Sequence, residues 1–419
     1  MTKLKIIELF GGIGACSKAL ENIGIDYEIV DYVEIDKYAV ASFNAIHDTN
    51  FEPQDICKWN KDIEADLIMH GSPCQDFSLA GKQAGGDKDS GTRSSLMYET
   101  IRIVEKIKPK YVIWENVKNL VSKKHIHNFE AYLEQMDTLG YNNYWKVLNA
   151  KNYGIPQNRE RVYTVSIRKD INKTFEFPEG EELKLKLKDM LEDNVDEKYY
   201  LSDKQIEYLE NGKYNSAKPS NKVKTTNTGI APTLDTMSGG QRQPFIQVKN
   251  ATKKGYLEAY EGDGVDISSR MKYHRGNVQP QSIQTIDCTS GEGHGVVVIN
   301  KKQVLCNKLI EENKVKEYDI IRHSYSESRM KEWETRNIEK NNESPTLDTR
   351  CDCLGVAVNQ PPLRIRKLTP KECWRLMGFD DESFEKAQPH NSNAQLYKQA
   401  GNSIVVNVLM AIFKNLLDD

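Results

Sequence analysis

Short apolar runs alternate with amphipathic stretches through residues 5–167, and few folds accommodate that pattern. The short runs are typical of strands, and the stretches between them show helical spacing. This alternation predicts an α/β fold in which helices cover a mostly parallel sheet. The expected strands are 5–10, 27–33, 66–69, 111–114, 145–148 and 162–167, and the expected helices include 17–23, 95–107 and 129–139.

Distinctive side chains follow successive strands of this predicted sheet. Glycines within 11–14 follow the first strand, Glu34 the second, Cys74 the third and Glu115 the fourth. Ligands of open α/β sheets bind beyond the carboxyl ends of the strands. We therefore expect these residues to line one crevice.

The length of 419 residues favours division into two lobes, because single hydrophobic cores stop growing below that size. The sequence becomes polar and rich in Gly and Thr at about residue 178, and helical spacing returns after residue 362. We predict a first domain at 1–178, a second, irregular or β-rich domain at 179–362, and a C-terminal segment at 363–419. An apolar stripe within 404–417 indicates a helix, so we expect this segment to return to the first domain.

The second region carries a degenerate repeat and a basic strip. The repeat recurs at 231–236, 281–285 and 344–349, each copy followed by a turn-like stretch and a β-branched run. Between residues 211 and 254, only Asp235 opposes a series of lysines and Arg242. Such a strip is either solvated surface or a basic interface.

Bulk composition narrows the class of protein. Mean hydropathy is -0.65, and Lys5 and Glu8 interrupt the first apolar run, so neither a signal peptide nor a membrane span is expected. We therefore expect a cytoplasmic protein with no membrane contact. The 8 cysteines are scattered, which favours free thiols, and Cys351 and Cys353 lack further ligands, so we expect no metal site.

Residues 10–14 read Phe-Gly-Gly-Ile-Gly and lead from a strand into a helix. Glycines there let a ligand approach the backbone, and helix N–H groups point outward. Glu34 suits the two hydroxyls of a ribose, which implies a cofactor that contains adenosine. The alternatives are a nicotinamide dinucleotide and a turn without a ligand. Ser17 disfavours the first, because it stands where the dinucleotide fingerprint ends in Gly or Ala.

Cys74, Glu115, Arg159 and Arg161 each have an ordinary explanation when taken singly. A cysteine is most often a small core residue, a glutamate at a strand end is usually solvated, and an arginine beside Glu160 can form a surface ion pair. Cys74, however, follows a proline in polar, Gly-rich surroundings. That setting suits an exposed reactive thiol better than a buried one.

In order and wording, these segments together resemble the motif series of the bacterial cytosine-5 DNA methyltransferases. The resemblance covers residues 4–170 and 363–415, and the region between them corresponds to the family's variable target-recognition region. The matching segments are Phe10-Gly-Gly-Ile-Gly14 (first motif), Glu34 (ribose acid), Asp55-Ile56 (adenine pair), Pro73-Cys-Gln75 (nucleophile motif), Glu115-Asn-Val117 (base-holding motif), Gln157-x-Arg-x-Arg161 (arginine motif), and 366–378 with Gly401-Asn-Ser403 (the last two motifs).

The resemblance implies an S-adenosylmethionine-dependent methyltransferase with a Rossmann-like, doubly wound sheet and a target-recognition domain. It implies methyl transfer to C5 of a cytosine flipped out of duplex DNA, with Cys74 adding to C6. Glu115 would donate a proton to N3, while Arg161, with Arg159 as second candidate, would favour the thiolate and hold the base. The predicted cofactor residues are Phe10, Gly12, Gly14, Glu34, Asp55, Ile56, Pro73, Leu96, Asn402 and Ser403.

The expected partner is double-stranded DNA, bound by a monomeric enzyme. In this context the basic strip becomes a candidate for phosphate contacts. The Thr-Leu pairs resemble a phosphate-contacting motif, and Thr346 is favoured because it lies nearer the arginine-rich block that follows. A restriction endonuclease could act on the same site without stable contact. The predicted DNA-contacting residues are Gln75, Ser78, Arg93, Asn116, Val117, Thr346 and Thr233.

Two alternatives remain open. Relatives with this core can modify transfer RNA, although compact RNA-acting relatives lack so large a region as 178–362. A catalytically inactive DNA-binding protein could keep the same fold, although all the reactive residues are present here.

Overall fold

The computed structural model describes residues 3–73, 93–200 and 363–418 of the chain. Between 200 and 363 it describes short segments at 246–249, 256–259, 264–266, 278–280, 283–284, 294–299, 320–322, 338–339 and 354–356. The chain divides into two compact units. Unit 1 comprises Met1–Val195, Gln281–His294 and Leu368–Asp419, and unit 2 comprises Asp196–Pro280 and Gly295–Lys367.

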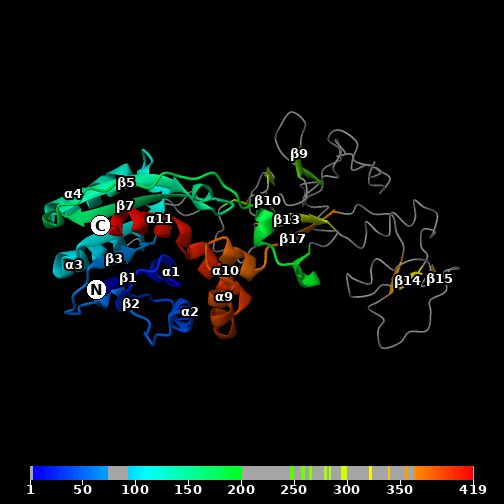
Figure 1. Ribbon diagram of the computed structural model, residues 1–419, viewed down its shortest axis with the longest axis horizontal. Helices are drawn as coiled ribbons and strands as arrows, with labels where there is room; N and C mark the ends of the chain where they lie inside the picture. The colour runs from blue at the N-terminus through cyan, green and yellow to red at the C-terminus, as the bar shows by residue number, and fades with distance from the viewer. Residues whose placement is uncertain are drawn as a thin grey trace, which may run out of the picture. The chain divides into compact units, whose positions relative to one another are not determined.

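Unit 1 is built on a 6-stranded sheet in the order β2-β1-β3-β4-β7-β5 (Figure 1). Neighbouring strands run parallel from β2 to β4, whereas β7 is antiparallel to both β4 and β5. The strands are β1 (Leu4–Leu9), β2 (Tyr27–Val33), β3 (Leu67–His70), β4 (Tyr111–Val117), β5 (Tyr141–Asn149) and β7 (Glu160–Arg168). Every predicted strand is present, so the α/β prediction is confirmed for a mixed sheet.

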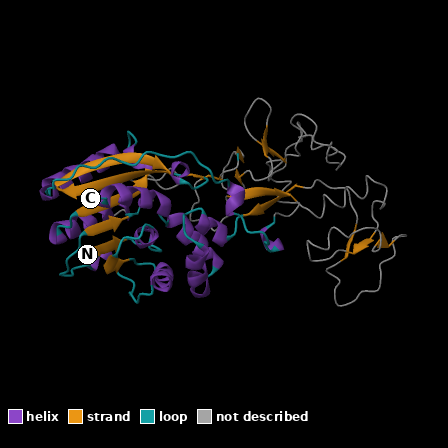
Figure 2. Cartoon of the chain, in the orientation of Figure 1, coloured by secondary structure: helices purple, strands orange, loops and turns teal. Residues whose placement is uncertain are grey.

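Helices flank this sheet, and alternate residues of β1 show why both faces are covered (Figure 2). Ile7 and Leu9 belong to the core that includes side chains of α3 and α4. Glu8, between them, points the other way and accepts hydrogen bonds from Ser17 of α1. The helices are α1 (Ala15–Asn22), α2 (Lys37–His47), α3 (Met97–Ile107) and α4 (Ile126–Thr138).

The C-terminal segment completes unit 1 with α8 (Pro370–Arg375), α9 (Asp381–Ala387), α10 (Asn393–Asn402) and α11 (Val406–Leu417). Residues Asn393–Leu417 are long and apolar enough, by length and composition, to cross a membrane. They form two helices, however, and α11 packs against α1 (Figure 1). Leu409, Ile412 and Phe413 of α11 are fully buried, so this apolar stretch serves the core of unit 1.

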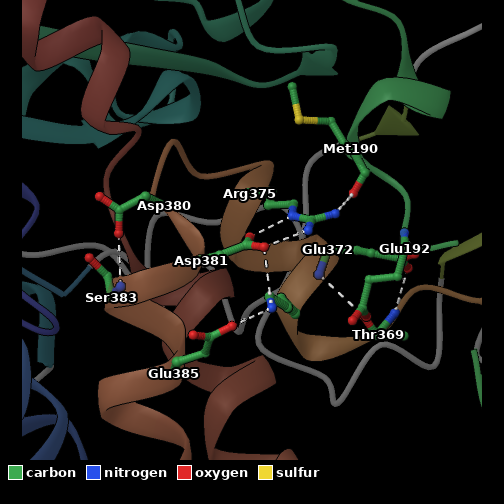
Figure 3. A network of polar contacts seen from close by, with 10 residues as sticks. Met190, Glu192, Thr369, Glu372, Arg375, Asp380, Asp381, Ser383 and Glu385 are labelled. Carbon is green, nitrogen blue, oxygen red and sulfur yellow. Dashed lines mark hydrogen bonds and ion pairs between the residues drawn. The ribbon is translucent and has the colours of Figure 1, made fainter. Parts of the chain in front are cut away.

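A polar network holds residues 187–195 against the C-terminal helices (Figure 3). Arg375 pairs with both carboxylate oxygens of Asp381 at 2.7 Å and donates to the Met190 carbonyl at 3.1 Å. The Glu192 N–H donates to Glu372 at 2.8 Å, and Glu372 also forms a capping box with Thr369. Within unit 1, the network therefore joins the end of Met1–Val195 to the start of Leu368–Asp419.

The described strands of unit 2 form small sheets. One has the order β11-β10-β13-β17, another β15-β14-β16, and β8 pairs with β9. Their bounds are β8 (Ile246–Lys249), β9 (Tyr256–Ala259), β10 (Gly264–Asp266), β11 (Val278–Gln279), β13 (His294–Ile299), β14 (Ile320–Arg322), β15 (Ile338–Glu339), β16 (Leu354–Val356) and β17 (Leu363–Lys367). Within unit 1, β12 (Ile283–Gln284) runs parallel to β6 (Gln157–Asn158).

Candidate active site

The glycine turn after β1 leaves open space beside its backbone. Phe10, Gly12 and Gly14 all have positive φ, at 53°, 55° and 81°. A Cβ at Gly12 would meet no atom within 4 Å, whereas one at Gly14 would lie 2.1 Å from Nε2 of His47. His47 therefore leaves no room for a side chain at position 14, whereas Gly12 borders a space that a ligand could fill.

Glu34 follows β2 and faces this turn. One carboxylate oxygen accepts from the Gly12 N–H at 3.2 Å, and the other accepts from the Asp36 N–H at 2.9 Å. Burial raises the pKa of the Glu34 carboxyl group above its usual value. Next to it, Ile35 leaves 70% of its surface exposed, more than any other large apolar side chain in the described residues. Ile35 was not among the predicted cofactor residues, and its place beside Glu34 is the signal that could have indicated it.

The predicted adenine pair lies on a loop that is tied firmly to β2. Ile56 is buried, and the Asp55 carboxylate accepts from the Cys57 N–H at 3.0 Å. Asp31 anchors this loop, because its buried carboxylate accepts from Trp59 Nε1 at 2.6 Å, Lys61 Nζ at 2.7 Å and Gln54 Nε2 at 3.1 Å. Asp31 was not among the predicted residues, since an acid within a strand carries no functional signal by itself.

The chain leaves β3 through Gly71, Ser72 and Pro73, and β4 holds this exit in place. Trp114 Nε1 donates to the Ser72 hydroxyl at 2.9 Å, and the Asn116 amide donates to the Ser72 carbonyl at 3.3 Å. Asn116 is buried, so its side chain is engaged within the protein, and its predicted DNA contact stays a prediction.

Glu115 and Arg161 face each other from adjacent strands, β4 and β7. Arg161 Nε lies 3.2 Å from Glu115 Oε1, and the backbones pair at Val117 and Arg161. Burial raises the pKa of the Glu115 carboxyl group, against the opposing charges of Arg161 and then Arg159. A buried acid whose proton is retained more strongly can donate a hydrogen bond to a polar substrate.

Arg159 lies between β6 and β7, two positions before Arg161, but its side chain reaches a different part of the protein. Its guanidinium donates to the carbonyls of Ser403 at 2.8 Å and Gly401 at 3.3 Å. Asn402, the last residue of α10, lies between those two carbonyls. The structure thus gathers the predicted residues of the arginine motif, the base-holding motif and the final motif in unit 1.

Of the remaining predicted residues, Leu96 lies within the described part of the chain, whereas several others lie outside it. Leu96 ends the 3-10 helix Arg93–Leu96 and packs against the core beside α3. Across the described segments, no group of His, Cys, Asp and Glu side chains is arranged to hold a metal ion. Cys74, Gln75, Ser78, Thr233 and Thr346 lie outside the described residues, as do the repeats at 231–236 and 344–349.

Comparisons with known proteins agree along the length of the chain. The family model for C-5 cytosine-specific DNA methylases matches residues 4–418. The chain is 35% identical to the orphan methyltransferase M.SPRI of Bacillus phage SPR and 34% identical to M.Rho11sI of phage rho11s, over 100% of this chain and 98% of each relative. Among solved structures, the Entamoeba histolytica methyltransferase EhMeth is similar in fold, with a TM-score of 0.58 at 14% identity over 100% of this chain and 99% of that one.

Proposed function

Because the chain belongs to the C-5 cytosine-specific DNA methylase family, we propose that it transfers a methyl group from S-adenosylmethionine to C5 of a cytosine rotated out of duplex DNA. Family membership makes the chain a DNA (cytosine-5) methyltransferase. The donor, the flipped base and a covalent step through Cys74 are the content of the proposal. The observation that carries it is the buried Glu115 facing Arg161 beside the strand that leads to Cys74.

The residues around the glycine turn fit the proposed donor. Open space beside Gly12, the Glu34 carboxylate and the exposed Ile35 side chain offer a backbone approach, a hydroxyl acceptor and an apolar surface. S-adenosylmethionine, when bound, supplies a methyl group activated by its sulfonium. The residues proposed to hold it are Phe10, Gly12, Gly14, Glu34, Asp55, Ile56, Pro73, Leu96, Asn402 and Ser403.

The reacting residues are assigned by what each can do. The Cys74 thiolate attacks C6, which makes C5 nucleophilic, and the charge of Arg161 favours the thiolate. Glu115, whose pKa is raised by burial, donates its proton toward N3 as negative charge develops on the ring. Once C5 has taken the methyl group, loss of the C5 proton to water, return of the N3 proton to Glu115 and departure of Cys74 restore the aromatic base.

DNA binding is assigned to both parts of the chain. Extrusion of the base costs a few kcal/mol, which contacts to the flanking phosphates must offset. We assign target recognition to residues 179–362, including Thr346 or Thr233 and the basic strip. Gln75, Ser78, Arg93, Asn116 and Val117 are assigned to the flipped nucleotide. The enzyme is proposed to act as a monomer in the cytoplasm, with or without a restriction endonuclease of the same specificity.

Bisulfite sequencing of DNA from cells that express the protein tests this function. The wild type should protect cytosines at one recurring sequence, and Cys74→Ala should protect none while still binding duplex DNA. Methylation of transfer RNA without methylation of duplex DNA would reverse the choice of substrate. Full activity of Cys74→Ala would remove the proposed nucleophile.

Donor binding is tested separately by calorimetry. Glu34→Ala should weaken the binding of S-adenosylmethionine, because the buried carboxylate is the proposed acceptor for the ribose hydroxyls. Unchanged affinity in a folded Glu34→Ala protein would contradict that assignment.

A further inference from the structure

We infer that Arg159 is a positioning residue. It holds the end of α10 against the segment that begins β7, and it does not itself touch the reacting base. The inference rests on the proposed function, since it assigns the Gly401–Ser403 turn to the donor side of the reaction. It separates two arginines that lie two positions apart and were both predicted to be catalytic.

The arginine motif spans β6 and the start of β7, and alternate residues along it are buried. Gln157 is 0% exposed and Arg159 is 4% exposed, whereas Asn158 and Glu160 are exposed to solvent. Gln157 Nε2 donates to the Leu376 carbonyl at 2.7 Å. The buried side chains of Gln157 and Arg159 therefore contact the C-terminal segment.

Two hydrogen bonds of Arg159 hold the C-terminal end of α10. Its guanidinium bonds the carbonyls on either side of Asn402, at the point where α10 ends. The carbonyls at the end of a helix carry partial negative charge and lack partners within the helix. One terminal nitrogen of the buried guanidinium, Nη2, donates to both carbonyls, so it satisfies them while their partial negative charge stabilises the guanidinium.

Helix α10 is also fixed on its other side, to the start of α2, which follows the proposed ribose acid in the chain. Lys398 pairs with Asp36 at 2.7 Å, two positions beyond Glu34, and Gln399 accepts from Ser42 of α2 at 3.0 Å. α10 therefore spans from the Glu34 side to the Arg159 side. Through it, Arg159 ties the donor-binding residues to the strand on which Arg161 faces Glu115.

Arg161 has a different environment, which makes it a matched control. Its guanidinium faces Glu115 at 3.2 Å and is only partly buried, and it donates to the backbone carbonyl of its neighbour Glu160 at 2.8 Å. The same substitution at the two positions should therefore affect different steps. Arg159→Gln should lower the affinity for the methyl donor, and Arg161→Gln should lower the rate of the reaction at the base.

The experiment compares Arg159→Gln with Arg161→Gln in the full-length protein. Calorimetry with S-adenosylmethionine measures donor affinity, and tritium release from C5 of cytosine in duplex DNA at saturating donor measures turnover. Arg159→Gln should weaken donor affinity about tenfold or more, as expected for the loss of two buried hydrogen bonds, and change saturated turnover by less than about threefold. Arg161→Gln should show the opposite pattern.

Arg159→Lys keeps the experiment decisive if the glutamine variant does not fold. It retains the charge and one nitrogen that can donate to both carbonyls, so it should restore folding and recover donor affinity at least in part. Unchanged donor affinity with a loss of saturated turnover of about a hundredfold, in either Arg159 variant, would overturn the inference and make Arg159 catalytic. If the wild type bound donor without methylating DNA, the proposed function would fail, while the affinity comparison would still test the anchor.

Discussion

Glu8 shows how one buried side chain makes stability depend on pH. It is 2% exposed and caps α1 by accepting from the Ser17 N–H at 3.0 Å and from the Ser17 hydroxyl. Burial raises the pKa of Glu8 from 4.5 to about 7, against those hydrogen bonds. Between these two values the Glu8 carboxyl group holds more protons in the folded protein than in the unfolded chain. The stability that Glu8 contributes is therefore fully present below pH 4.5 and is lost as the pH rises through 7.

Glu8→Gln removes this dependence while keeping an oxygen that can accept from Ser17. Its stability relative to the wild type should improve by about 3 kcal/mol between pH 5 and pH 8, measured by urea unfolding. Glu52→Gln, at an exposed position, is the control and should show no comparable trend. A constant difference between wild type and Glu8→Gln across this range would contradict the buried acid.

Asp31 offers a second test at the scale of a single residue. Asp31→Asn removes a charge that Trp59, Lys61 and Gln54 all contact, so the loop that carries Asp55 and Ile56 should loosen. We expect donor affinity to fall about tenfold, measured by calorimetry. Glu64→Gln, which removes an exposed ion pair with Lys5, should leave the affinity unchanged. Equal effects of the two substitutions would argue against the anchoring role.

The positions of Glu34 and Glu115 could be predicted from sequence, because the order of parallel strands places residues near their carboxyl ends at one edge of the sheet. Glu34 follows β2 and Glu115 lies within the last residues of β4, and their roles in the reaction stay proposals. Asp31 and Ile35 could not be predicted, because their importance depends on partners or exposure that no local pattern encodes. The separate contacts of Arg159 and Arg161 depend on residues 401–403, which lie far away in the sequence.

At the scale of elements, the glycine turn between β1 and α1 gives a sharp contrast. Gly12 and Gly14 both have positive φ, but only Gly14 lacks room for a Cβ, because His47 and Phe43 crowd it. Gly12→Ala should cost about 1 kcal/mol of unfolding free energy, from its backbone conformation alone. Gly14→Ala should cost about 2–4 kcal/mol, because overpacking adds to the same backbone strain. Urea unfolding of the two variants measures the difference, and equal losses would contradict the crowding at Gly14.

Prediction of the elements succeeded where burial produces a pattern and fell short where it does not. β5 begins at Tyr141, earlier than predicted, because this edge strand exposes several of its residues and so lacks a continuous apolar run. The direction of β7 was not predicted either. An apolar run gives no information on whether a strand runs parallel or antiparallel to its neighbours.

At the scale of the whole molecule, the proposed donor site draws on residues from the start and the end of the chain. A ligand that binds only this assembled site should stabilise unit 1 by mass action. At a donor concentration about 100 times its Kd, the gain should be about 2.7 kcal/mol, seen as a higher Tm by calorimetry. Glu34→Ala should lose most of that shift at the same concentration. An equal shift in both proteins would place the donor elsewhere.

The grouping of residues 281–294 with unit 1 illustrates what composition cannot show. It rests on pairing between Ile283–Gln284 and Gln157–Asn158, in a stretch whose composition matches the polar region around it. Short strand pairs of this kind are set by tertiary contacts, so the sequence carries little trace of them.

The account depends above all on attack by the sulfur of Cys74 on a cytosine. The most direct measurement is mass spectrometry of the protein after incubation with S-adenosylmethionine and duplex DNA that contains 5-fluorocytosine at the target, where the fluorine blocks the final elimination. We predict a stable protein–DNA conjugate whose tryptic peptide carries the nucleotide on Cys74, and none with Cys74→Ala. Methylation of ordinary duplex DNA by the same preparation, without any conjugate at Cys74, would contradict the mechanism.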